Sequence, residues 1–191
     1  MAVTTYKTIK RYNTPHHSHY LTFSCFKRRP FLIKDRSRQW FVDALSKSLQ
    51  KHDYILWAWV IMPEHVHLLV HPRQNEYDIS LFLKSLKLAV TNQALQHVRK
   101  HAPSFLAQML DVQPNGTRSH RFWQRGPGYD TNLWTPKHIW EKIDYIHRNP
   151  VRRKLARLPK EWPWSSALDF AHQRDAPLLP LGLDSIPWVP Q

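Results

Sequence analysis

Apolar residues recur along this chain with two different periods, which divide it into elements. Alternating or continuous apolar runs predict strands over 19–26, 54–61 and 65–71. Apolar stripes at helical spacing predict a helix over about 36–51 with Asp35 as N-cap, and a longer one that Asp78 caps and that extends to about Lys100. The break at Pro63-Glu64 joins the second and third strands as a hairpin.

The later part of the chain predicts one more strand and one more helix. Part of 120–134 is expected to be a strand, and Pro127 favours an edge position or a bulge. Thr135-Pro136 is a typical helix start, and this helix is expected to stop at Pro150. The order β-α-β-β-α-β plus a further helix predicts an α+β fold of the ferredoxin-like (split βαβ) type, an antiparallel sheet with two helices on one face.

The same pattern divides the chain into regions. We expect a basic N-terminal arm over 1–18, the folded domain over 19–158, and a Pro- and Trp-rich C-terminal tail over 159–191 that wraps the domain surface. Residues 101–119 contain a Pro-Asn-Gly turn and no clear period, so they are predicted to be a loop insertion.

Composition narrows the possible partners. Lys plus Arg number 28 against 14 Asp plus Glu, a net charge of +14, which favours a polyanion such as nucleic acid. The single cysteine, Cys25, excludes an intramolecular disulfide framework and a multi-cysteine zinc site. No apolar run approaches the roughly 20 residues that span a bilayer, and the N-terminus lacks a signal-peptide core, so we expect a cytoplasmic protein without a membrane segment.

Candidate chemistry begins in the third predicted strand. Strand side chains alternate between faces, so His65 and His67 point the same way while Val66 and Leu68 point into a core. A same-face pair of neutral imidazoles can start a divalent-metal site. Two solvated or internally hydrogen-bonded histidines are the alternative, and the pair alone leaves both open.

The last predicted helix carries a second group of candidates. Its apolar stripe is Ile139, Trp140, Ile143 and Ile146, which puts Tyr145 on nearly the opposite face, with Asn149 one turn further on. Tyr145 is then displayed for contact, or it is simply an exposed residue of an amphipathic helix that Asn149 caps. The distance of both residues from the histidine pair would decide between these interpretations.

Two segments together resemble a known family. Pro63-Glu64-His65-Val66-His67, followed by Asp144-Tyr145-Ile146-His147-Arg148-Asn149-Pro150-Val151, is similar to the single-tyrosine HUH transposases of the IS200/IS605-like group, closest to the REP-associated tyrosine transposases. The similarity extends through Arg121-Phe122-Trp123-Gln124 and Glu161-Trp162-Pro163-Trp164-Ser165-Ser166, over about residues 15–170. The loop at 101–119 and the Gly126-Pro127-Gly128 break depart from the family pattern, which bears on substrate geometry rather than on the four site residues.

The resemblance implies an enzyme. His65 and His67 would bind Mg²⁺ or Mn²⁺ with Asn149 as third ligand, and Tyr145 would be the nucleophile that cleaves single-stranded DNA carrying REP-like hairpins through a 5′-phosphotyrosine link. A monomer is slightly favoured, and a homodimer with the tyrosine delivered in trans is possible. The residues expected to contact DNA are basic or aromatic: Arg28, Arg29, Lys84, Lys87, Arg121, Trp123, Arg125, Arg148, Arg152 and Arg153.

Two other functions remain open at this point. A basic protein with the same fold could bind hairpin DNA without cleaving it. A histidine-triad nucleotide hydrolase also uses alternating histidines, but here Leu69 occupies the position of the third one and His71 comes two residues later.

Overall fold

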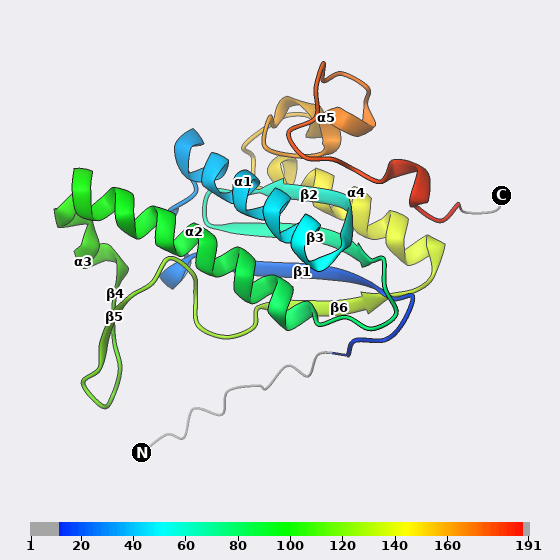
Figure 1. Ribbon diagram of the computed structural model, residues 1–191. Helices are drawn as coiled ribbons and strands as arrows, with labels where there is room; N and C mark the ends of the chain where they lie inside the picture. The colour runs from blue at the N-terminus through cyan, green and yellow to red at the C-terminus, as the bar shows by residue number, and fades with distance from the viewer. Residues whose placement is uncertain (1–11, 189–191) are drawn as a thin grey trace.

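A four-stranded antiparallel sheet forms the centre of the computed structural model, which describes residues 12–188. Its order is β2 (Tyr54–Ile61), β3 (His65–Pro72), β1 (Ser18–Ser24) and β6 (Tyr129–Leu133). Helices α1 (Asp35–His52) and α2 (Ile79–His101) cover one face, and α4 (Pro136–Arg152) covers the other (Figure 1). The predicted ferredoxin-like fold is confirmed. Most of the predicted N-terminal arm, residues 1–11, lies outside the described residues.

Alternation along the strands separates two cores. Val66, Leu68 and Val70 are fully buried against α1 and α2. Asp78 is the N-cap of α2, as predicted, and its carboxylate accepts the backbone N–H groups of Ser80 and Leu81. The prediction for α1 is wrong by one residue, because Asp35 lies inside the first turn, where a carboxylate is favoured by the helix dipole, and Lys34 is the N-cap.

Helix α4 packs on the other face of the sheet. Thr135 caps it by accepting the N–H of His138, and Pro136 is its first residue, as predicted. The predicted stop at Pro150 is wrong, since the helix continues to Arg152. A proline in the last turn removes one hydrogen bond only, and here its ring is buried.

Short regular elements occupy 103–112 and 118–120, so the prediction of a loop throughout 101–119 is wrong, whereas its Pro-Asn-Gly turn is present at 114–116. The 3-10 turn Pro103–Phe105 and the short helix α3 (Leu106–Met109) precede a hairpin of β4 (Leu110–Val112) and β5 (Arg118–His120), which projects from the sheet (Figure 1). Buried Met109 anchors its base, and the Asp111 carboxylate contacts both Arg121 and Arg125. These long-range contacts have no local sequence signal.

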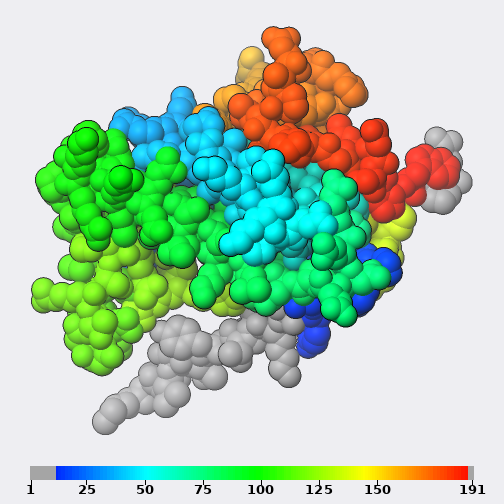
Figure 2. Space-filling view, in the orientation of Figure 1, coloured from blue at the N-terminus to red at the C-terminus, as the bar shows by residue number. Residues whose placement is uncertain are grey.

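The C-terminal segment covers the edge strand β2. Its short elements are Pro159–Glu161, α5 (Ala167–Phe170) and Leu183–Ser185, and Figure 2 shows the segment lying beside α1. Ile61 donates its N–H to the Trp164 carbonyl, and Gly182 donates to Leu56. An exposed edge would invite pairing with another chain, so this cover protects the sheet. Within residues 12–188, no helix has the length and apolarity to cross a membrane.

Candidate active site

The histidine pair lies on the face of β3 that α4 covers. His65 and His67 are 6% and 4% exposed, and their Nε2 atoms are 3.0 Å apart. Burial lowers the pKa of both imidazoles, and for His67 burial together with the neighbouring His65 lowers the pKa to about 3. Both rings are therefore neutral at pH 7, which is the form that binds a metal.

Neighbouring side chains orient the two rings. His65 Nδ1–H donates to Glu64 Oε1 at 3.1 Å, and Arg153 Nη1 donates to the same oxygen at 2.9 Å. His67 Nδ1 lies 2.8 Å from the Tyr20 hydroxyl and 2.7 Å from the Thr22 hydroxyl, either of which can accept its proton. The Glu64 carboxylate can only accept, so it favours the His65 tautomer whose Nε2 carries a lone pair, and a His67 Nδ1–H that donates to either hydroxyl leaves its Nε2 lone pair on the same side.

The donor set fits a small divalent cation. Two adjacent ligands of an octahedral ion, each about 2.1 Å from it, lie about 3.0 Å apart, which matches the observed separation of the two Nε2 atoms. Asn149 is 7% exposed, and its Nδ2 donates to the Tyr145 carbonyl at 2.8 Å, which leaves its Oδ1 directed toward His67. Among residues 12–188 no group of three His, Cys, Asp or Glu side chains is placed to hold a metal.

Tyr145 comes from α4 and lies against the histidine pair. Its ring makes T-shaped contacts with His67 at 5.7 Å and with Tyr20 at 6.1 Å between ring centroids. Two cations lie over the same ring, Lys142 Nζ at 5.3 Å and Arg152 Cζ at 5.0 Å from its centroid. Two positive charges therefore lie beside this ring.

The predicted position of Tyr145, nearly opposite the apolar stripe, is wrong. Trp140 is 38% exposed and lies at the margin of the buried face, whereas Ile139, Ile143 and Ile146 are buried. Without Trp140 the centre of the stripe rotates toward Tyr145, which therefore lies on its flank. This flank position lets the tyrosine be half-buried and still reach the sheet.

These residues line one cleft of about 460 Å³ between the sheet and the end of α4. The structure brings seven predicted site residues together there: Arg28, His65, His67, Tyr145, Asn149, Arg152 and Arg153. Thr22 and Ser24, which sequence reasoning missed, complete the lining. Their polar alternation along β1 with Tyr20 is the signal that could have identified them.

Seven predicted DNA contacts lie outside this cleft: Arg29, Lys84, Lys87, Arg121, Trp123, Arg125 and Arg148. Arg29 donates to the Gln108 carbonyl at 2.7 Å, and the exposed Arg148 pairs with Asp144 at 2.7 Å. Lys84 and Lys87 belong to α2, which packs on the opposite face of the sheet from the histidines. Lys87 Nζ lies 4.6 Å from the centroid of the Phe23 ring.

The basic aromatic stretch before β6, residues 121–125, makes contacts within the fold. Arg121 and Arg125 both pair with Asp111. The predicted role of Trp123 in DNA contact is contradicted, because this residue is 5% exposed in the core beneath α1 and α2. Its indole N–H donates to the Lys87 carbonyl at 3.2 Å, so its ring offers no face to a nucleobase.

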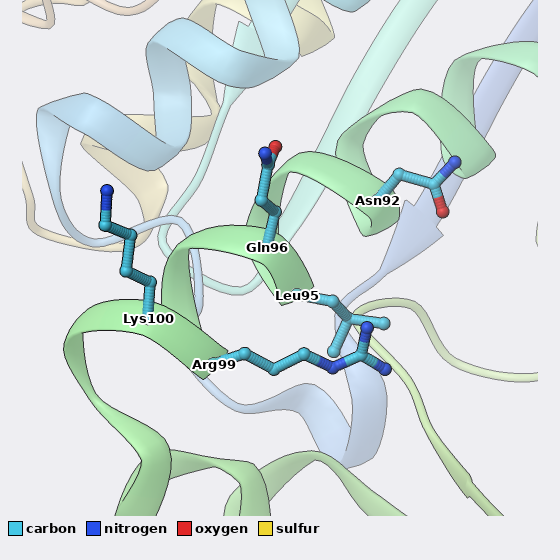
Figure 3. Close-up of a pocket in the computed structure, with 5 residues that line it drawn as sticks. All are labelled: Asn92, Leu95, Gln96, Arg99 and Lys100. Carbon is cyan, nitrogen blue, oxygen red and sulfur yellow. The ribbon is translucent and has the colours of Figure 1, made fainter.

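A second hollow, of about 670 Å³, lies on the C-terminal half of α2. Figure 3 shows Gln96 and Lys100 projecting from one side of the helix, with Asn92, Leu95 and Arg99 completing the lining. It lacks the histidines, the tyrosine and the buried polar contacts of the first cleft. The candidate chemistry therefore belongs to the cleft beneath α4.

Comparison with known proteins identifies a family and a fold for this chain. The family model described as "Transposase IS200 like" matches residues 14–111, just over half of the chain. A protein of Haemophilus influenzae assigned as a REP-associated tyrosine transposase is 25% identical over 142 residues, covering 71% of this chain and 75% of the relative. A solved structure of a REP-associated tyrosine transposase bound to a REP hairpin has a TM-score of 0.69 at 19% identity, and covers 93% of this chain and 92% of that one.

The fold, the paired histidines on β3 and the family match define the class of protein. This chain belongs to the IS200-like transposase family. The matched region contains His65 and His67 but ends before α4, so the assignment of Tyr145 and Asn149 depends on the geometry described above. Members of this family generally use a divalent metal.

Proposed function

We propose that this transposase is a metal-dependent single-strand DNA endonuclease and strand transferase that acts on hairpin-containing DNA, with Tyr145 as its nucleophile. The observation that carries the proposal is the contact between Tyr145 and His67, whose ring centroids are 5.7 Å apart within one chain. This contact supports a site in which the proposed nucleophile and the proposed metal ligands come from one chain. The hairpin is proposed because the structural relative was solved with a REP hairpin.

In the proposed reaction the Tyr145 phenol oxygen attacks the scissile phosphorus and the bond from phosphorus to the 3′-oxygen breaks. The products are a 5′-phosphotyrosine ester and a free 3′-hydroxyl, which takes up a proton equivalent to the one that the phenol releases. Lys142 and Arg152 lie over the Tyr145 ring, where both cations can also contact the phosphate that the phenol attacks. The bond energy is retained, so attack by another 3′-hydroxyl reverses the step and joins two strands without ATP.

His65, His67 and Asn149 would hold the Mg²⁺ or Mn²⁺ ion. A bound divalent ion acts as a Lewis acid on the phosphate and stabilises the leaving oxygen. The chain's own contribution is to keep both imidazoles neutral by burial and to fix their tautomers through Glu64 and Thr22.

Arginines at the cleft would bind the DNA backbone on both sides of the scissile phosphate. Arg28, Arg152 and Arg153 line the cleft and are exposed, so their charges can neutralise phosphates and release counterions. The predicted basic residues outside the cleft, namely Arg29, Lys84, Lys87, Arg121, Arg125 and Arg148, could touch only DNA that extends beyond it.

A covalent-adduct assay tests this function. Labelled hairpin oligonucleotides with single-stranded flanks are incubated with the protein and Mn²⁺ and run on a denaturing gel. A slower band is expected that disappears with EDTA, with Tyr145→Phe and with His67→Ala. Tyr12→Phe, at a tyrosine 62% exposed and away from the cleft, is the matched control and keeps the band.

The same assay separates the two alternatives. Tight hairpin binding with no adduct across a broad oligonucleotide panel would replace cleavage by a binding role. Release of a mononucleotide from a nucleotide conjugate would favour a histidine-triad hydrolase. The latter is disfavoured because His71 stacks on Trp57 at 4.7 Å between centroids and its Nδ1 lies 3.1 Å from the Ser18 hydroxyl, apart from the metal ligands.

A further inference from the structure

Tyr129 is an exposed aromatic residue beside the cleft that neither the sequence motifs nor the proposed reaction uses. It is the first residue of β6 and lies directly opposite Thr22 in the antiparallel register with β1. Residues opposite each other in such a pair point to the same face of the sheet, so Tyr129 is on the face of the histidines. Tyr129 is 52% exposed while its ring contacts that of the buried Tyr20, so one part of the ring is accessible to a ligand.

The turn before Tyr129 holds it close to β1. Gly128 has φ +79°, and a Cβ atom there would lie 2.5 Å from the Thr22 carbonyl oxygen. Only glycine lets the chain approach β1 so closely with this backbone conformation. The Gly126-Pro127-Gly128 turn therefore places Tyr129 on the sheet next to Thr22, whose hydroxyl contacts the proposed metal ligand His67.

Aromatic rings continue from the nucleophile to Tyr129. The Tyr20 ring makes T-shaped contacts with Tyr145 at 6.1 Å and with Tyr129 at 5.9 Å. The Tyr20 hydroxyl also contacts His67 Nδ1. Since β3 and β6 are separated by β1 alone, the two strands lie about 10 Å apart, twice the strand spacing, within the reach of one nucleotide.

We propose that Tyr129 stacks on the base of a nucleotide adjacent to the scissile phosphate, so that the single strand crosses the sheet from His67 toward β6. The inference rests on the proposed function, because it needs a phosphate at the histidine pair. Stacking on a tyrosine accepts any base, so this residue positions the strand and does not read its sequence. The cleft's arginines supply the backbone contacts that such stacking complements.

Binding to a non-cleaving protein tests the stacking. In a Tyr145→Phe background, Tyr129→Ala and Tyr129→Leu should each weaken binding of a single-stranded oligonucleotide about tenfold, whereas Tyr129→Phe should keep it. Tyr129→Leu preserves apolar contact with Tyr20 and removes only the aromatic face. Tyr12→Ala, at another exposed tyrosine, should bind normally.

Abasic substitutions locate the base. An abasic residue on one side of the scissile phosphate should weaken binding by the same factor when Tyr129 is present and have no further effect in Tyr129→Leu. Equal binding by Tyr129→Leu and the parent, or an equal abasic penalty in both, would overturn the inference. If wild-type protein forms the covalent adduct and these variants bind normally, only the stacking is wrong; if the stacking pattern appears without any adduct, only the cleavage is wrong.

Discussion

At the scale of single residues, the site depends on contacts that keep two buried imidazoles neutral and oriented. Glu64 is central, because it accepts from His65 and pairs with Arg153 at the end of α4. One carboxylate thus connects the strand of the proposed metal ligands to the helix of the proposed nucleophile. Orienting contacts of this kind contribute to metal affinity although they do not touch the metal.

Removing this carboxylate should weaken metal binding. Glu64→Ala frees His65 to change tautomer, and we expect the affinity for Mn²⁺ to fall about 10- to 100-fold. Calorimetric titration of Mn²⁺ measures this, with Glu76→Ala, at an exposed glutamate, as the control that should bind normally. An unchanged affinity in Glu64→Ala would show that Glu64 does not orient the ligand.

His71 should make folding stability depend on pH. Its pKa is lowered by burial, followed by the charges of His16 and His19, while its ring stacks on Trp57 and contacts Ser18. In the unfolded chain the ring binds a proton below about pH 6.5, so stability is complete above that pH and falls as the pH drops toward the lower folded value.

Urea unfolding between pH 8 and pH 5 measures this dependence. One proton contributes at most about 1.4 kcal/mol per pH unit, and His71→Gln should show a shallower fall by part of that amount. His138→Gln, at an exposed histidine, should follow the wild type. Parallel pH curves for His71→Gln and wild type would contradict the assignment.

At the scale of elements, backbone geometry decides where the site's side chains arrive. Helix α4 reaches the sheet with its flank, so that Tyr145 and Asn149 face the histidines while Ile143 and Ile146 fill the core. The turn before β6 also positions side chains at the site, because Gly128 lets this turn lie close to Thr22 of β1. Each arrangement needs one particular local conformation.

Two glycines of that turn provide a matched pair. Gly126→Ala meets no atom within 4 Å and should cost only the strain of its positive φ, about 1–2 kcal/mol. Gly128→Ala adds a clash with the Thr22 carbonyl and should destabilise more. It should also reduce adduct formation, because Thr22 contacts His67. Urea unfolding and the gel assay measure the two effects; equal losses in both variants would contradict the close approach.

The strands, the two long helices and the histidine pair could be predicted because their signals are local. Periodicity identifies the elements, and alternation places His65 and His67 on one face. The hairpin over 110–120, the burial of Trp123 and the contacts of Tyr20 and Thr22 could not be predicted in this way. They depend on which strands become neighbours, and a one-residue change of register would reverse every face.

The wrong prediction for the position of Tyr145 comes from one other residue of the same helix, Trp140. Trp140 is apolar and lies at helical spacing, so the pattern includes it in the apolar stripe. The predicted centre of that stripe then lies further from Tyr145. In the structure Trp140 lies at the margin, and its indole N–H donates to the Pro187 carbonyl of the C-terminal segment at 2.9 Å. An aromatic residue with a polar group satisfies both core and surface, so periodicity assigns it ambiguously.

At the scale of the whole molecule, one chain contains every residue of the proposed site. Tyr145 contacts His67 of its own sheet, and the pair of Arg153 with Glu64 holds the end of α4 in place. We infer that the tyrosine acts in cis and that a monomer is sufficient for cleavage.

A mixing experiment tests the action in cis. Tyr145→Phe retains the metal site and His67→Ala retains the nucleophile, so a partner-supplied tyrosine would restore one functional site in a mixed dimer. We expect an equimolar mixture of the two variants to give no adduct on the denaturing gel. A recovered band would show that the tyrosine is exchanged between chains.

The most direct test of the central claim is to map the protein–DNA bond. The adduct formed with a labelled hairpin oligonucleotide and Mn²⁺ is digested with nuclease and protease, and the modified peptide is sequenced by mass spectrometry. The account predicts a 5′-phosphonucleotide on the peptide that contains Tyr145, attached to its phenol oxygen. Attachment at another tyrosine, such as Tyr20 or Tyr129, or cleaved DNA with no modified peptide, would contradict it.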